Sequence, residues 1–387
     1  MLFKRCRRLW GWLSHLRQGR QLTGEVVDYL WFGTGIHYAL EDFHGYNLYK
    51  HPARAFLAYV HATQEARILP ESWAEHQKLG VAIMSYYADE WLRHRDPLTT
   101  YVEDGIPQVE VNFAIDLGVK TSDGRQALYG VTLDRVVIDE WDRLWIVEAK
   151  TAKQLRSLHL DVDDQVTGYA WAAWRKYGRP VAGVIYQQFL KRVPLMPKIL
   201  STGKVSTDKR QATSAALYAK VLTDIYGSPE LSPPENIGCL NSLRAMEDED
   251  RDKFIVRHRI ERNENQLRSF EDKIHMELED IANPNLPLYP NPAWTCDWCP
   301  LQVPCVAMDS KEDWEKVLEE FSQVTDDGLT AREKEQIKWR NLLPEPSKLP
   351  LLSEEAVQYQ QLLSQLPDPE QQAGLSTEQI FLREIGL

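Results

Sequence analysis

Residues 128–138, LYGVTLDRVVI, and residues 144–150, LWIVEAK, decide the fold of this chain. From about residue 106, apolar side chains recur with a period of two, which is typical of β-strands. The segment VEVNFAIDLGV at 109–119 has the same pattern, and the turn signals SDGR and DEWDR separate the three segments. We therefore expect an antiparallel meander of three strands.

Helical patterns surround this meander. A basic amphipathic helix is expected over residues 1–20, a further helix over 32–43, and a helical stretch over 54–95 that Pro and Ser interrupt near 70–72. After the meander, a helix over 163–177 precedes a buried apolar strand at 181–189. Strands followed by a helix and a further strand predict a mixed α/β (α+β) fold, in which helices flank a central mixed sheet.

The second half of the chain is more polar. We expect residues 190–240 to be irregular and a long charged helix to occupy about 247–282. Residues 306–387 contain 17 Asp and Glu and 8 Lys and Arg, so they carry a charge of −9. Helical patterns joined by proline-bearing linkers predict that these residues form a loosely packed, acidic helical appendage.

Bulk composition limits the partners of the chain. The total charge is −12, so subtracting −9 for the tail leaves −3 for residues 1–305, and such a body can still present a local basic surface to nucleic acid. The acidic tail could recruit a protein partner or compete with DNA for basic sites. No segment approaches the roughly 20 apolar residues that a membrane span needs. Five cysteines, three of them crowded together, argue against a disulfide framework and for a reducing, cytoplasmic compartment.

Three charged residues of the meander can form a site. Asp134 lies in one strand, while Glu148 and Lys150, two residues apart in the next strand, point to one face. In a hairpin the three converge, and two close carboxylates repel each other unless a cation or a proton lies between them. Oxygen ligands suit Mg²⁺ or Mn²⁺, and an ammonium group can orient water and stabilise charge on a phosphodiester. The alternative is that these side chains face solvent, as most charged side chains do.

The residues around this site resemble a known family. The segments GVTLD at 130–134 and IVEAK at 146–150 resemble the core of the PD-(D/E)XK nuclease superfamily, in its RecB-like branch with CRISPR-adaptation and AddB-type nuclease domains. Three further elements follow the order of the family: the GTGIH helix motif at 33–37, the acidic residue Glu110, and a Q-x-x-x-Y motif at Gln165 and Tyr169. The resemblance covers residues 1–305, which we expect to form the nuclease domain, and leaves the tail outside.

The resemblance implies a restriction-endonuclease-like core and a role for each matching residue. The metal ligands would be His37, Asp134, Glu148 and the carbonyl of Ala149. Lys150 would position the water that attacks the phosphodiester.

Other residues near the expected site have a functional and a structural interpretation. The resemblance implies that Gln165 and Tyr169 contact DNA. The alternative interpretation is that they belong to a helix face that packs on the sheet. The alternative for His37 is a histidine with satisfied hydrogen bonds near the helix interior. Glu41, one turn after His37, could orient the imidazole through a hydrogen bond.

Three cysteines near the end of this region form a C-x2-C-x5-C run: Cys296, Cys299 and Cys305. A closed metal site needs a fourth ligand, for which Cys6 and Cys239 are candidates, and zinc is the usual metal at such spacing. The RecB-like resemblance instead implies a [4Fe–4S] cluster that Cys6 completes. This structural cluster would staple the first helix to the end of the nuclease domain and leave Cys239 as a free buried thiol.

Basic residues just after the core could bind the substrate. Lys191 and Arg192 begin a basic group that extends to Arg210, and their position after the core strands favours contact with DNA. The alternative is that these charges are simply solvated.

These features together predict a metal-dependent deoxyribonuclease. We expect an exonuclease that hydrolyses phosphodiester bonds at DNA ends and prefers single strands. By resemblance, it would serve recombination, repair, phage replication or CRISPR adaptation. One alternative is a structure-specific endonuclease with the same site. Another is a non-catalytic DNA-binding scaffold subunit, against which the complete set of site residues argues.

Overall fold

The computed structural model describes residues 2–23, 28–63, 70–93, 98–154, 157, 159–248, 253–324 and 331–349. The strands in chain order are β1 (Arg20–Leu22), β2 (Thr99–Thr100), β3 (Val102–Glu103), β4 (Ile106–Pro107), β5 (Val109–Lys120), β6 (Gln126–Ile138), β7 (Leu144–Ala152), β8 (Val181–Leu190), β9 (Ile255–Glu261) and β10 (Ser322–Val324). The α-helices are α1 (Leu2–Arg5), α2 (Arg7–Leu13), α3 (Asp28–His44), α4 (Pro52–Ala62), α5 (Pro70–Arg93), α6 (Asp164–Tyr177), α7 (Ala215–Tyr226), α8 (Pro234–Asp248), α9 (Glu264–Ala282), α10 (Gln302–Asp309), α11 (Trp314–Phe321) and α12 (Ala331–Arg340). Short 3-10 helices are η2 (Leu160–Val162), η3 (Pro229–Leu231), η4 (Trp294–Trp298) and η5 (Pro346–Lys348).

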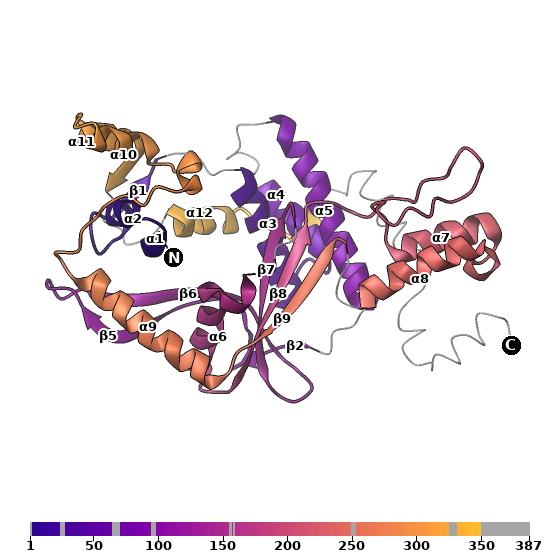
Figure 1. Ribbon diagram of the computed structural model, residues 1–387, viewed down its shortest axis with the longest axis horizontal. Coiled ribbons are helices and arrows are strands. Elements are labelled where there is room, and N and C mark those ends of the chain that lie inside the picture. Colours follow the sequence, from indigo (N-terminus) through magenta and orange to yellow (C-terminus); the bar gives the residue numbers. More distant parts are fainter. Residues whose placement is uncertain are drawn as a thin grey trace.

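A six-stranded mixed sheet forms the centre of the molecule (Figure 1). Its order is β2-β6-β7-β8-β9, and β5 also pairs with β6. The strands β5, β6 and β7 run antiparallel, which confirms the predicted meander. β8 lies parallel to β7, with Gln188 opposite Lys150. The two strands are parallel because the connection through α6 returns the chain to the end of the sheet at which β7 begins. β9 then pairs antiparallel with β8.

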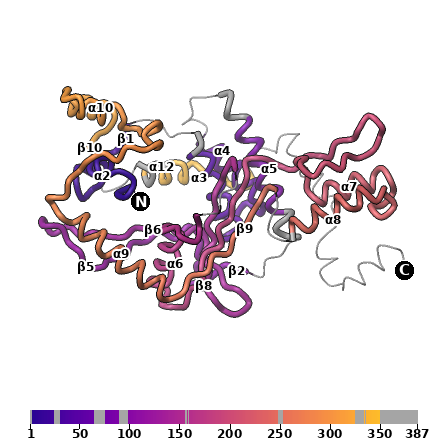
Figure 2. The backbone as a smooth tube through the Cα atoms, in the orientation of Figure 1, coloured from indigo at the N-terminus to yellow at the C-terminus, as the bar shows by residue number. Residues whose placement is uncertain are grey.

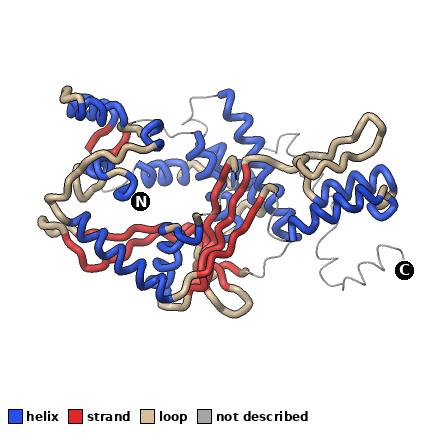
Figure 3. The backbone as a smooth tube through the Cα atoms, viewed as in Figure 1, coloured by secondary structure: helices blue, strands red, loops and turns tan. Residues whose placement is uncertain are grey.

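Helices cover both faces of this sheet (Figure 3). On one face, α6 and α9 pack on the strands through a cluster that includes Trp171 and Phe270. On the other face, α3, α4 and α5 pack through Phe32, Phe56 and neighbouring rings against Phe189 of β8. The predicted mixed α/β fold, a central mixed sheet flanked by helices, is therefore confirmed. Within the described ranges, no helix has both the length and the apolarity to cross a membrane.

The segment 190–240 contains more regular structure than the expected irregular chain. It holds α7 and the first part of α8. The side chain of Ser214 accepts the N–H of Leu217 and caps the start of α7, while Gly227 ends the helix. The expectation was wrong because the residues that cap α7, Ser214 and Gly227, are of types that are also typical of loops.

The helix expected over 247–282 is wrong in its first part. Residues 255–261 form β9, and α9 begins only at Glu264. In β9 only Val256 and Ile260 are buried, and charged residues between them hide the strand pattern. The helix expected over residues 1–20 is also wrong, because it breaks at Cys6 and its second part, α2, ends at Leu13.

The described part of the tail packs on the rest of the protein (Figure 2). β10 pairs with β1, with Val324 opposite Arg20. Trp339 of α12 is only 3% exposed and lies in the apolar cluster of α3 and α4. The expectation of a loosely packed appendage is therefore wrong for these residues, and residues 350–387 lie outside the described part.

Candidate active site

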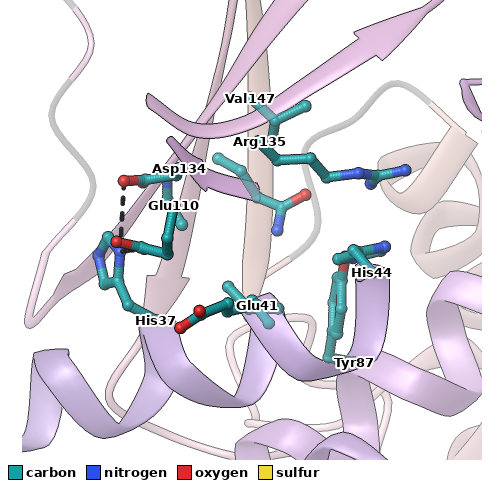
Figure 4. A pocket seen from close by; sticks show the side chains of 11 residues that line it. His37, Glu41, His44, Tyr87, Glu110, Asp134, Arg135 and Val147 are labelled. Carbon is teal, nitrogen blue, oxygen red and sulfur yellow. Dashed lines mark hydrogen bonds and ion pairs between the residues drawn. The ribbon is translucent and has the colours of Figure 1, made fainter. Parts of the chain in front are cut away.

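Three side chains from three elements meet beside the sheet (Figure 4). His37 lies in the middle of α3, Glu110 near the start of β5, and Asp134 in the second half of β6. His37 Nδ1 lies 3.0 Å from Glu110 Oε1 and 3.4 Å from Asp134 Oδ1. One possible ligand atom of each residue lies within 4.8 Å of the others. The three side chains can therefore coordinate a single ion.

A fork between two strands fixes Asp134. β6 and β7 pair only where residues 135–138 meet residues 144–147, so their pairing stops just before Asp134. Beyond this point the backbone N–H of Ala149 donates to Asp134 Oδ2 over 2.8 Å. This bond holds one carboxylate oxygen and leaves Oδ1 facing His37.

Glu110 has an unusual backbone conformation. Its φ is 46°, in a region that few residues other than glycine adopt. Such a conformation costs roughly 1–3 kcal/mol and persists where the surrounding structure holds it, often at functional sites. The sequence identified Glu110 only as a matching family position, not as a ligand. No local signal in the sequence predicts this backbone, which accompanies the contact of Glu110 with His37.

Glu41 does not orient His37 as expected. Its Oε2 lies 2.6 Å from Arg340 Nη2, while Glu110 contacts the imidazole instead. The expectation was wrong because it considered only α3, whereas the tail returns to this helix and supplies the arginine.

Glu148 and Lys150 lie beside these three residues. Glu148 is 1% exposed, and its Oε1 forms an ion pair with Lys150 and accepts the O–H of Tyr169 at 2.8 Å. Gln165 Nε2 donates to Tyr169 Oη at 2.7 Å. Glu148 Oε2 is buried without a hydrogen-bond partner among the described residues. The Q-x-x-x-Y residues thus support Glu148, and their contact with DNA stays a prediction.

The electrostatics of the site separate its two central carboxyl groups. Burial opposes a charge on His37, but Asp134 and Glu110 hold its pKa well above the usual value. Burial also opposes a charge on Asp134, but His37 and Lys150 outweigh it and lower the pKa of that carboxyl. Burial, together with the charge of Asp134, raises the pKa of Glu148 to about 7. The site therefore holds one carboxylate that stays ionised and one that resists ionisation.

The donor set fits a divalent cation. Carboxylate oxygens with an imidazole nitrogen suit Mg²⁺ or Mn²⁺. His37 lies between two carboxylates that raise its pKa, and a metal ion bound there would neutralise them in place of a proton. Glu148 is not one of the three residues that meet there, so its role as a further ligand through the buried Oε2 stays a prediction. A role for the Ala149 carbonyl as a ligand stays a prediction.

Lys191 and Arg192 leave the sheet at the end of β8. The N–H of Lys191 donates to the carbonyl of Ala152, the last residue of β7, and its Nζ lies 4.8 Å from the centroid of the Phe32 ring. Arg192 donates from Nε and Nη2 to the carbonyl of Lys253, at 2.9 and 2.6 Å. Arg192 therefore links two segments of the protein, and contact of either residue with DNA stays a prediction.

The cysteines predicted to form a cluster are not among the described groups placed to hold a metal ion, so the [4Fe–4S] cluster stays a prediction. Cys6 separates α1 from α2 and belongs, with Cys299 and Cys305, to an apolar cluster shared by α2, α10 and α11. Burial raises the pKa of the Cys299 thiol, and the charges of Cys6 and Cys296 raise it further. Cys239 is a buried free thiol in a different cluster, with α7 and α8.

The comparison with known families agrees with the motifs and the geometry. The family model described as the PD-(D/E)XK nuclease superfamily matches residues 1–306. This match includes all residues of the candidate metal site, Glu148 and Lys150. The chain matches no curated protein.

Proposed function

The chain belongs to the PD-(D/E)XK nuclease superfamily, and from this membership and the site geometry we propose that it is a metal-dependent DNA exonuclease. It acts at DNA ends, prefers single strands and belongs to the RecB-like branch. The observation that carries the proposal is the meeting of His37, Glu110 and Asp134, with ligand atoms within 4.8 Å of one another. The buried, unpartnered Oε2 of Glu148 supports it.

His37, Glu110 and Asp134 would hold Mg²⁺ or Mn²⁺, with Glu148 and the Ala149 carbonyl as further ligands. Such an ion would supply the Lewis-acid chemistry that hydrolysis of a phosphodiester needs.

Lys150 and the Q-x-x-x-Y residues complete the reaction site. Lys150, in contact with Glu148, orients the attacking water and stabilises the charge that develops on the phosphate. Tyr169 and Gln165 keep the Glu148 carboxylate in position through their hydrogen bonds. Lys191 directly follows β8 and donates its N–H to the last residue of β7, and its side chain attracts the phosphate backbone of the substrate.

End-labelled single- and double-stranded DNA, incubated with Mg²⁺ or Mn²⁺, tests the proposal. We expect the wild type to shorten strands from their ends and Lys150→Ala to lose this activity. Lys120→Ala, which removes an exposed lysine of β5, serves as the matched control and retains activity. Degradation by purified Lys150→Ala at the wild-type rate contradicts the assignment.

Closed circular single-stranded DNA and labelled RNA define the substrate. An exonuclease leaves the circle intact, whereas cleavage of the circle favours the structure-specific endonuclease. Faster hydrolysis of RNA than of DNA contradicts the proposed substrate. Binding of DNA without hydrolysis under all metal conditions favours the scaffold subunit.

The cysteine region supports a second element of the proposal. Cys6, Cys296, Cys299 and Cys305 bind a [4Fe–4S] cluster that joins α2 to α10 and closes a nuclease domain over residues 1–305. The shared apolar cluster of Cys6, Cys299 and Cys305, together with the effect of Cys296 on the pKa of Cys299, supports this role, which is structural. Brown, anaerobically purified protein that contains iron and acid-labile sulfide is expected. Colourless protein loaded with zinc would assign the thiols to Zn²⁺ instead.

A further inference from the structure

The segment after the family match returns to the helices of the metal site. The match ends at residue 306, whereas α12 begins at Ala331. The ring of Trp339 of α12 packs edge-to-face against Tyr38 of α3 and Tyr59 of α4, with its centroid 5.1 and 5.0 Å from theirs. The contact is buried, so α12 is fixed against the helix that carries His37.

The next residue, Arg340, reaches a carboxylate of the same helix. Its Nη2 lies 2.6 Å from Glu41 Oε2. The guanidinium carbon lies 5.7 Å from the ring centroid of Tyr38 and 4.9 Å from that of Trp339. Because two rings hold the planar guanidinium, the ion pair loses little conformational freedom when it forms.

Glu41 lines the same pocket as the metal site. It lies one helical turn after His37, and Figure 4 shows the two side chains next to each other below Glu110 and Asp134. Burial raises the pKa of the Glu41 carboxyl, the charge of Glu110 adds to this, and Arg340 opposes both. Without the arginine, the pocket would contain one more carboxylate that can turn toward a cation.

We propose that Arg340 is a positioning residue that withholds Glu41 from the metal site. By pairing with Glu41, it leaves the cation to His37, Glu110 and Asp134. Loss of the guanidinium frees the Glu41 carboxylate, which then strengthens the binding of a divalent cation. This inference rests on the metal site of the proposed function. It assigns a control of that site to a residue outside the family match.

Binding of Mn²⁺ to the full chain, measured by titration calorimetry without DNA, tests the inference. Arg340→Gln is expected to bind Mn²⁺ roughly three- to tenfold more tightly, because a carboxylate near a divalent ion contributes on the order of 1 kcal/mol even when partly solvated. Arg340→Lys keeps the charge and is expected to stay within about twofold of the wild type. Lys348→Gln is the matched control, because it removes a charge from the same segment that pairs with Glu345 instead.

A double-mutant cycle separates the role of Glu41 from a general effect of charge. Glu41→Gln alone is expected to keep the wild-type affinity, and Arg340→Gln in that background is expected to produce no tightening. Equal affinities of the wild type and Arg340→Gln overturn the inference, as does a tightening that persists without Glu41. If Arg340→Gln does not fold, weakened Mn²⁺ binding by Glu41→Gln decides against the inference, and unchanged binding supports it. Wild-type affinity in His37→Ala would instead contradict the metal site itself.

Discussion

The ionisation of Glu148 in the metal-free protein carries a free-energy cost. The side chain is 1% exposed, and its Oε2 lacks a partner among the described residues. Burial and the charge of Asp134 raise the pKa of Glu148 from its ordinary value of 4.5 to about 7. Since one pKa unit corresponds to about 1.4 kcal/mol, ionisation of this group destabilises the fold by about 3 kcal/mol.

The sign of the effect follows from the direction of the shift. A carboxyl group with a higher pKa in the folded than in the unfolded state binds its proton more tightly when folded. The stability that this proton provides is complete below the unfolded pKa and is lost as the pH rises through the folded pKa. For Glu148 the loss therefore begins near 4.5 and is complete above about 7.

Chemical denaturation of the metal-free protein, followed by circular dichroism across this pH range, measures the loss. Glu148→Gln cannot ionise, so the stability of the wild type minus that of the variant is expected to fall by about 3 kcal/mol. Glu312→Gln, at an exposed position, serves as the control and should follow the wild type. Saturating Mn²⁺ should remove the loss, because the cation neutralises the buried oxygen. Parallel curves for the wild type and Glu148→Gln would refute the reasoning.

Three further substitutions test other parts of the molecule. Trp339→Ala is expected to lower the free energy of unfolding by about 3–5 kcal/mol, whereas Trp141→Ala, at a site 64% exposed, should change it by less than about 0.5 kcal/mol; urea denaturation compares them. Tyr169→Phe removes a hydrogen bond to Glu148 and should lower kcat about tenfold with little change in KM, so an unchanged single-turnover rate would contradict its positioning role. Cys299→Ser should lose iron and melt at a lower temperature, while Cys239→Ser keeps the wild-type iron content; equal iron contents would remove Cys299 from the cluster.

The sheet was predictable because its signals are local. Alternating apolar residues and two polar turns specify the meander, and in the first part of the strand that contains Asp134 buried and exposed side chains alternate as this pattern indicates. The spacing of Glu148 and Lys150 along one strand correctly predicted that they lie together. The search for alternating apolar residues failed for β9. Only two of its seven side chains are buried, and charged residues interrupt the apolar pattern.

Other parts of the candidate site depend on contacts that sequence spacing does not encode. Glu110 approaches His37 with a backbone that residues other than glycine rarely adopt. Arg340 meets Glu41 across 299 positions of the chain, so the partner of Glu41 depends on how the tail packs. Sequence alone does not identify such long-range pairs, because many arginines of the chain are equally suitable partners for a given carboxylate.

Charge balance links the metal site to the tail. In the metal-free protein three cationic groups at or near the site hold acidic partners: His37 with Glu110 and Asp134, Lys150 with Glu148, and Arg340 with Glu41. Among these carboxylates, Oε2 of Glu148 is the buried oxygen that lacks a partner in the described part of the chain. A divalent ion bound by His37, Glu110 and Asp134 can replace the proton of His37 while the other two pairs stay intact. Lys150 and Arg340 therefore neutralise Glu148 and Glu41, which leaves less negative charge to bind metal ions. This smaller negative charge favours a site for one cation rather than two.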